Sequence, residues 1–194
     1  MNRKTLNTLL TVFSVILVLA LILLRSPRES EPGVLVEEGS CYKLYADGEL
    51  YTLRLKDAEG KTLREDGPMT KRPVVTEVEP GLWSVSSSAG PDISLRWTYF
   101  YSPSRNLISE SFYGVLAARE DLVILAGNQA LTVRGMFSEK PWWDLTDFSQ
   151  PLADTAATPF RSAAFAEDGK SLAVTYLSGE DLRQVTETVP LPEA

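Results

Sequence analysis

The chain begins with a long uncharged apolar segment, Leu6 to Leu24, in which leucine, isoleucine, valine and phenylalanine predominate. A helix of about 19 residues, at about 1.5 Å per residue, spans about 28 Å, which is close to the thickness of the hydrocarbon core of a bilayer. We therefore predict a single transmembrane helix over residues 6–24, preceded by a short cytoplasmic tail, residues 1–5. The chain would then be held in a membrane through residues 6–24.

The same segment could instead be the core of a cleaved secretory signal, because Arg3 and Lys4 give it a basic start. The residues that follow the apolar segment favour an uncleaved signal anchor, since residues 25–28 (RSPR) contain no small-x-small cleavage pattern. Basic residues flank both ends, so charge alone does not set the orientation. A tail of a few residues normally stays in the cytoplasm. This predicts a single-pass membrane protein whose body is extracytoplasmic, at the cell surface or in the periplasm of a bacterium.

After the apolar segment the composition changes twice. Residues 25–40 contain two prolines, two glycines and four glutamates, which is typical of a flexible, extended linker. Over residues 41–194 no window sustains apolar residues at helical spacing, while short runs rich in Val, Leu, Tyr, Thr and Trp recur between turn residues. This pattern predicts an all-β domain with antiparallel sheets.

Several turn sequences indicate hairpins within this domain. Asp47-Gly48 and Gly127-Asn128 can supply the positive φ values that two-residue turns require, and residues 167–170 (EDGK) form a third turn. The following residues 171–177 (SLAVTYL) alternate, with Leu, Val and Tyr on one face of a strand and the remaining side chains on the other.

Turn glycines near residues 48, 90, 127 and 169 are about 40 residues apart, which is within the range of propeller blades. Residues 161–189 (RSAAFAEDGKSLAVTYLSGEDLRQVTETV) resemble one blade of a WD40-like or TolB-like β-propeller, and residues 42–65 show a looser version of the same pattern. The resemblance implies a propeller-like domain of about four irregular blades that serves as a binding scaffold, with no catalytic residue to carry over. A sandwich or barrel is the alternative.

The amino-acid composition limits the partners, metals and cofactors that the domain is expected to bind. The formal net charge of -7 and the sequence pI of about 4.8 argue against nucleic acid and anionic headgroups as partners of the domain, because both would be repelled. The sequence has no histidine, the commonest metal ligand and general base, so we expect neither a metal nor a cofactor. The single cysteine, Cys41, is expected to be a free thiol, with dimerisation through it as the alternative.

Aromatic residues supply the candidate binding site. Trp97, Tyr99 and Tyr101 should share one face of a strand and Phe100 the other, so most of these rings are expected in the core. Residues 138–147 (SEKPWWDLTD) instead read as a loop or a single helical turn. Exposed tryptophan beside carboxylates suits stacking on a sugar ring and hydrogen bonding to its hydroxyls. The candidate ligand-binding residues are Trp142, Trp143, Asp144 and Asp147. The alternative is a loop that closes one end of a sheet with a tryptophan plug.

No catalytic residue can be named. The carboxylate pairs Glu120-Asp121 and Glu180-Asp181 lie at predicted turns, where acidic residues are common, and no serine has a histidine base or a nucleophile-elbow sequence. We therefore predict a membrane-anchored extracytoplasmic binding module with a protein or glycan partner, and no enzyme. The alternatives are a carbohydrate-active hydrolase that uses Asp144 or Asp147, and a structural subunit of a membrane complex.

Overall fold

The computed structural model describes residues 32–90, 95–140 and 142–192. The predicted tail and transmembrane helix, residues 1–24, lie outside the described residues. Within the described ranges, no helix is both long and apolar enough to cross a membrane. The chain divides into two units, and the following account concerns the second, Gly33–Ala194.

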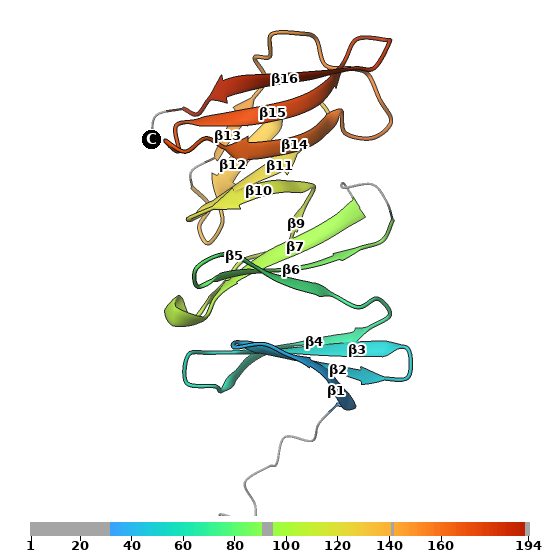
Figure 1. Cartoon of the computed structure of the whole chain (residues 1–194), viewed down its shortest axis with the longest axis vertical. Coiled ribbons are helices and arrows are strands. Elements are labelled where there is room, and N and C mark those ends of the chain that lie inside the picture. Colours follow the sequence, from blue (N-terminus) through green and yellow to red (C-terminus); the bar gives the residue numbers. More distant parts are fainter. Residues whose placement is uncertain (1–31, 91–94, 141, 193–194) are drawn as a thin grey trace, which may run out of the picture. The chain divides into compact units, whose positions relative to one another are not determined.

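Four antiparallel sheets make up this unit (Figure 1), which confirms the all-β prediction. Sheet A contains β1 (Val34–Glu38), β2 (Tyr42–Asp47), β3 (Leu50–Lys56) and β4 (Thr62–Met69). Sheet B contains β5 (Val74–Glu79), β6 (Leu82–Ser88), β7 (Arg96–Ser102), β8 (Leu107–Ile108) and β9 (Phe112–Tyr113), with the short 3-10 helix η2 (Pro103–Arg105) after β7. Sheet C contains β10 (Val115–Arg119), β11 (Leu122–Ala126), β12 (Leu131–Gly135) and β13 (Trp142–Leu145). Sheet D contains β14 (Phe160–Phe165), β15 (Ser171–Ser178) and β16 (Arg183–Pro190).

The linker predicted over residues 25–40 is too long, because part of it forms the first strand of the β domain. Val34–Glu38, which composition assigns to the linker over residues 25–40, pairs with β2 as an edge strand of sheet A. Its side chains are mostly exposed, and that is why composition alone resembles a linker. The described β domain therefore begins near Gly33.

The turn glycines mark the sheets. Gly48, Gly90, Gly127 and Gly169 each lie in the connection between two adjacent strands of a different sheet, so the spacing of about 40 residues corresponds to the succession of sheets A to D. Gly48 and Gly169 have positive φ values of 61° and 67°, as predicted. The prediction for Gly127-Asn128 is wrong, because neither residue has a positive φ. Gly127 instead allows a close approach: a Cβ there would lie 2.9 Å from the carbonyl oxygen of Ala130.

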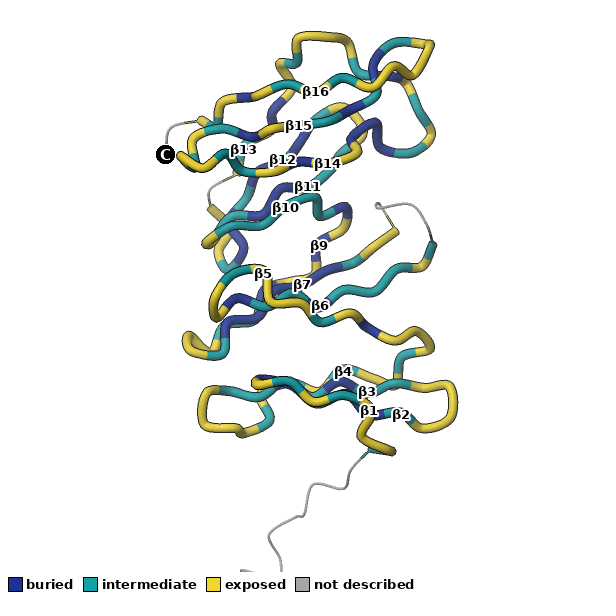
Figure 2. Tube along the Cα trace, in the orientation of Figure 1, coloured by how far each residue is buried: buried dark blue, intermediate teal, exposed yellow. Residues whose placement is uncertain are grey.

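Each core cluster is shared by two consecutive sheets. Figure 2 shows where the buried positions lie along the chain. Between sheets A and B the buried side chains are Cys41, Tyr42, Leu44, Leu53, Leu55, Val85, Tyr99 and Tyr101. Between sheets B and C they are Leu82, Phe100, Phe112, Val123 and Met136. Between sheets C and D they are Ile124, Leu131, Val133, Leu145, Phe160, Ala163, Leu172, Val174, Tyr176 and Val189. The four sheets are therefore layered in chain order.

Strand alternation explains how one strand contributes to two clusters. Tyr99 and Tyr101 of β7 face sheet A, while Phe100 between them faces sheet C, which confirms the predicted division of these rings. In β15 the predicted alternation is also confirmed, because Leu172, Val174 and Tyr176 are buried.

Candidate functional site

The adjacent residues Trp142 and Trp143 lie on opposite faces of β13. This strand pairs with β12, and Trp142 stands opposite Arg134 while Trp143 stands opposite Val133. The prediction of a loop or helical turn over residues 138–147 is therefore wrong for residues 142–145, which form a strand, while residues 138–140 and 146–147 belong to no helix or strand. The physical reason is that residues 142–145 (WWDL) alternate exposed and inward positions, but an aromatic ring occupies an exposed one and hides the alternation.

The two tryptophans differ in environment. Trp143 packs against the core between sheets C and D, as the tryptophan plug of the alternative interpretation would. Trp142 remains 57% exposed. Asp144 is on the same face as Trp142, where it accepts a 2.7 Å hydrogen bond from the Thr132 hydroxyl, and Asp147 is exposed beyond the end of β13. Trp142 lines the cleft described next, whereas Trp143, Asp144 and Asp147 are not among its lining residues.

This cleft, called the Trp142 cleft below, has a volume of about 660 Å³. One wall comes from β8 and the connection between β8 and β9, and the other from β12, the residues that follow it and Trp142 of β13. The lining residues are Ile108, Ser109, Glu110, Arg134, Met136, Phe137, Ser138, Glu139, Lys140 and Trp142. Its volume is within the range of small-molecule sites, and it combines apolar surface with two carboxylates and two cations.

Arg134 is the central polar side chain of the cleft. Its guanidinium carbon lies 4.5 Å from the centre of the Trp142 ring and 5.1 Å from the centre of the Phe112 ring. Nη2 of Arg134 donates a hydrogen bond to a carboxylate oxygen of Glu110. Nε of Arg134 is buried and has no hydrogen-bond acceptor among the described residues. Two aromatic rings therefore hold the guanidinium of Arg134 in place, and its Nε–H group is left without an acceptor in the part of the chain that the structure describes.

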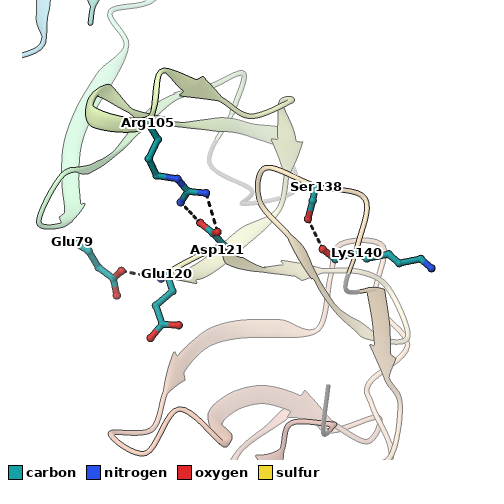
Figure 3. A network of polar contacts seen from close by, with 6 residues as sticks. All are labelled: Glu79, Arg105, Glu120, Asp121, Ser138 and Lys140. Carbon is teal, nitrogen blue, oxygen red and sulfur yellow. Dashed lines mark hydrogen bonds and ion pairs between the residues drawn. The ribbon is translucent and has the colours of Figure 1, made fainter. Parts of the chain in front are cut away.

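Figure 3 shows polar contacts next to two lining residues of the cleft, Phe137 and Ser138. Arg105 donates hydrogen bonds of 2.5 and 3.0 Å to the two oxygens of Asp121, and Asp121 raises the pKa of this guanidinium. The backbone nitrogen of Glu120 donates to Glu79 at 2.8 Å. Because Arg105 also lies over the ring of Phe137, 5.1 Å from its centre, the network connects sheet B to a lining residue.

The loop after β12 closes the cleft on the other side. The hydroxyl of Ser138 donates to the carbonyl oxygen of Lys140, and the backbone nitrogen of Met136 donates to the carbonyl oxygen of Asp121 at 2.7 Å. Figure 3 shows the Lys140 side chain extending away from the Arg105–Asp121 pair. The loop backbone is therefore held by one hydrogen bond within the loop and one to Asp121, and the Lys140 side chain extends away from the Arg105–Asp121 pair.

A second, smaller cleft of about 350 Å³ lies between sheets A and B. Tyr113 at its edge is 62% exposed, and Trp97 stacks on Tyr99 with a centroid distance of 6.0 Å. The Tyr99 hydroxyl donates to Asp66, and burial, followed by this bond, raises the pKa of Tyr99 strongly. Arg64 lies over the Tyr99 ring at 4.4 Å. The segment 108–113 contributes residues to both clefts, so they adjoin along the chain.

Sequence reasoning missed the residues that give the Trp142 cleft its chemistry, Arg134 and Glu110. They are 24 positions apart and meet only because β12 faces the segment between β8 and β9. Among the described residues, no group of three or more carboxylate or thiol side chains could hold a metal ion. Comparison with protein-family models, curated proteins and solved structures finds no match. The functional argument therefore depends on the geometry of the cleft.

Proposed function

We propose that this protein is a membrane-tethered binding module that receives a carbohydrate in the Trp142 cleft. The observation that carries the proposal is the position of Trp142: a large ring, 57% exposed, at the edge of a cleft of about 660 Å³ with charged groups around it. One side of the ring is occupied by Arg134. The exposed remainder offers the flat apolar surface on which a sugar ring stacks.

The polar groups of the cleft suit the hydroxyls of a sugar. Glu110 and Glu139 supply acceptors, and Lys140 supplies a donor. A folded protein normally covers a tryptophan with other side chains, and a ring left open beside charged groups is a common feature of recognition sites. A protein partner with an inserted side chain would need the same cleft but would not need this density of charged groups.

The tether and the location complete the proposal. The uncharged apolar segment over residues 6–24 supports an uncleaved membrane anchor, and the short tail supports an extracytoplasmic body. An extracytoplasmic carbohydrate-binding module would meet glycans of the cell envelope. Labelling of residues in the β domain of intact cells by a membrane-impermeant reagent tests this placement, and labelling only after lysis would contradict it.

We further propose that the four sheets are successive blades of an open, propeller-like array. The regular position of the turn glycines between adjacent strands of each sheet supports this proposal. Nothing in the geometry favours the hydrolase centred on Asp144 or Asp147, because neither carboxylate lines the cleft. The prediction that the protein is not an enzyme, like the structural-subunit alternative, stays a prediction.

The binding proposal is tested with the full-length protein in detergent micelles, titrated by calorimetry with a panel of neutral and acidic oligosaccharides. Trp142→Ala should weaken binding of any saccharide bound by the wild type by at least about tenfold, which corresponds to about 1.4 kcal/mol. Tyr113→Ala is the matched control, because it removes a similarly exposed aromatic ring that does not line the Trp142 cleft. It should leave the affinity for the saccharide unchanged. Absence of binding across the panel, or equal affinities of wild type and Trp142→Ala, would refute the proposal.

A further inference from the structure

The orientation of Arg134 is fixed before any ligand arrives. Its guanidinium lies between the rings of Phe112 and Trp142, and its side chain is only 16% exposed. A guanidinium presents its N–H groups in a planar fork that matches the two oxygens of a carboxylate. An arginine held in this way at the wall of a cleft is therefore prepared to receive a planar anion.

The hydrogen bonding of this fork is incomplete. Glu110 accepts a hydrogen bond from Nη2 through Oε1, while Nε is buried without an acceptor among the described residues. A buried donor without an acceptor is unfavourable, whereas a bidentate carboxylate would satisfy both Nη2 and Nε. Glu110 thus occupies the fork without filling it.

Glu110 is also weakly restrained. Its side chain is 57% exposed, and it lies in the short connection between β8 and β9. Water solvates an exposed carboxylate well after separation, whereas Arg134, at 16% exposure, still needs an anionic partner. Another carboxylate could replace Glu110 at small cost, and Glu110 would then be released to solvent.

We propose that the ligand of the Trp142 cleft is an acidic oligosaccharide, one whose carboxylate replaces Glu110 on Arg134. This inference rests on the proposed function, since one sugar ring stacks on Trp142 while the carboxylate of the same or the neighbouring sugar binds Nη2 and Nε. Lys140, which also lines the cleft, adds a second cation. The net charge of -7 acts against an anion at long range, but salt screens it beyond about 8 Å at physiological ionic strength.

The test compares two matched probes on the full-length protein in detergent micelles. The first is a glucuronic-acid-containing disaccharide, and the second is the same disaccharide with its carboxylate reduced to a hydroxymethyl group. The acidic probe should bind at least about tenfold more tightly, and Arg134→Lys should remove most of this preference, because lysine keeps the charge but loses the fork.

Glu110→Gln provides the decisive measurement. If Glu110 competes with the ligand carboxylate, removal of its charge should raise the affinity for the acidic probe by about three- to tenfold more than the affinity for the neutral one. Glu139→Gln is the matched control, because it removes one carboxylate from the same cleft without releasing Arg134. Its effect on the acidic probe should be clearly smaller.

The outcomes separate the two proposals. Equal affinities for the two probes, or equal effects of Glu110→Gln and Glu139→Gln, would overturn the carboxylate exchange even if Trp142→Ala still abolishes saccharide binding. If no saccharide binds, or if Trp142→Ala leaves binding unchanged, the proposed function itself fails. Stronger binding by Glu110→Gln, specific to the acidic probe, supports both.

Discussion

The contrast between Trp142 and Trp143 leads to a quantitative prediction about stability. Trp143→Ala removes a ring that packs in the core between sheets C and D. Replacement of a buried tryptophan by alanine costs about 3–5 kcal/mol, and a value of about 3 kcal/mol is expected for this partly buried ring. Trp142→Ala removes a ring that is 57% exposed, so little buried area is lost. Its main loss is the contact with Arg134, worth about 0.5–1 kcal/mol at an exposed site.

Urea unfolding of both variants, followed by circular dichroism, measures these losses. With an unchanged slope, the midpoint should fall much further for Trp143→Ala than for Trp142→Ala. Trp142→Phe is the control, because it keeps an aromatic ring over Arg134 and should be close to wild type. A cost for Trp142→Ala as large as that for Trp143→Ala would refute the assignment of the two rings to opposite faces of β13.

Three further predictions concern the core between sheets A and B. Tyr99→Phe removes the hydrogen bond to Asp66 that connects the two sheets and should cost about 1–3 kcal/mol in urea unfolding; no loss would contradict this role. Cys41 is buried and burial raises the pKa of its thiol, so a thiol reagent should modify it only on unfolding, and rapid modification of the native protein would contradict its burial. Burial raises the pKa of Tyr101 from 10 to about 12, so the unfolded chain loses this proton first and the free energy of unfolding should fall by about 3 kcal/mol between pH 10 and 12. Thermal unfolding against pH should show this fall, and a constant midpoint up to pH 12 would contradict it.

The all-β class and the hairpins at Gly48 and Gly169 were predictable from the sequence because their signals are local, whereas strands β1 and β13 were not predicted. The division of Tyr99, Phe100 and Tyr101 between two cores follows from the two-residue period of a strand. The turn at Gly48 follows from the Asp-Gly pair, because glycine readily adopts the positive φ that the turn requires. The sequence was misleading at Gly127. A glycine was expected there for a positive φ, but the structure needs it because Ala130 approaches too closely for a side chain.

The candidate site was only partly predictable. Trp142 could be singled out as an unusual neighbour of carboxylates, but Arg134 and Glu110 meet across two sheets, and no local spacing indicates this. Asp144 looked equally suitable, yet its side chain is bonded to Thr132 across the β12–β13 pair. Pairing register decides which side chains surround a cleft, and register depends on contacts that a single strand does not encode.

The layering of the sheets has a consequence for how the molecule is assembled. Every sheet is continuous in sequence, and every core cluster is completed by the next sheet along the chain. Such near-neighbour contacts shorten the loops that must close during folding and let structure propagate stepwise. A nascent chain can therefore finish each layer as soon as the following one leaves the ribosome, and a chain that stops before Phe160 would leave Ile124, Leu131 and Val133 facing water and prone to aggregate.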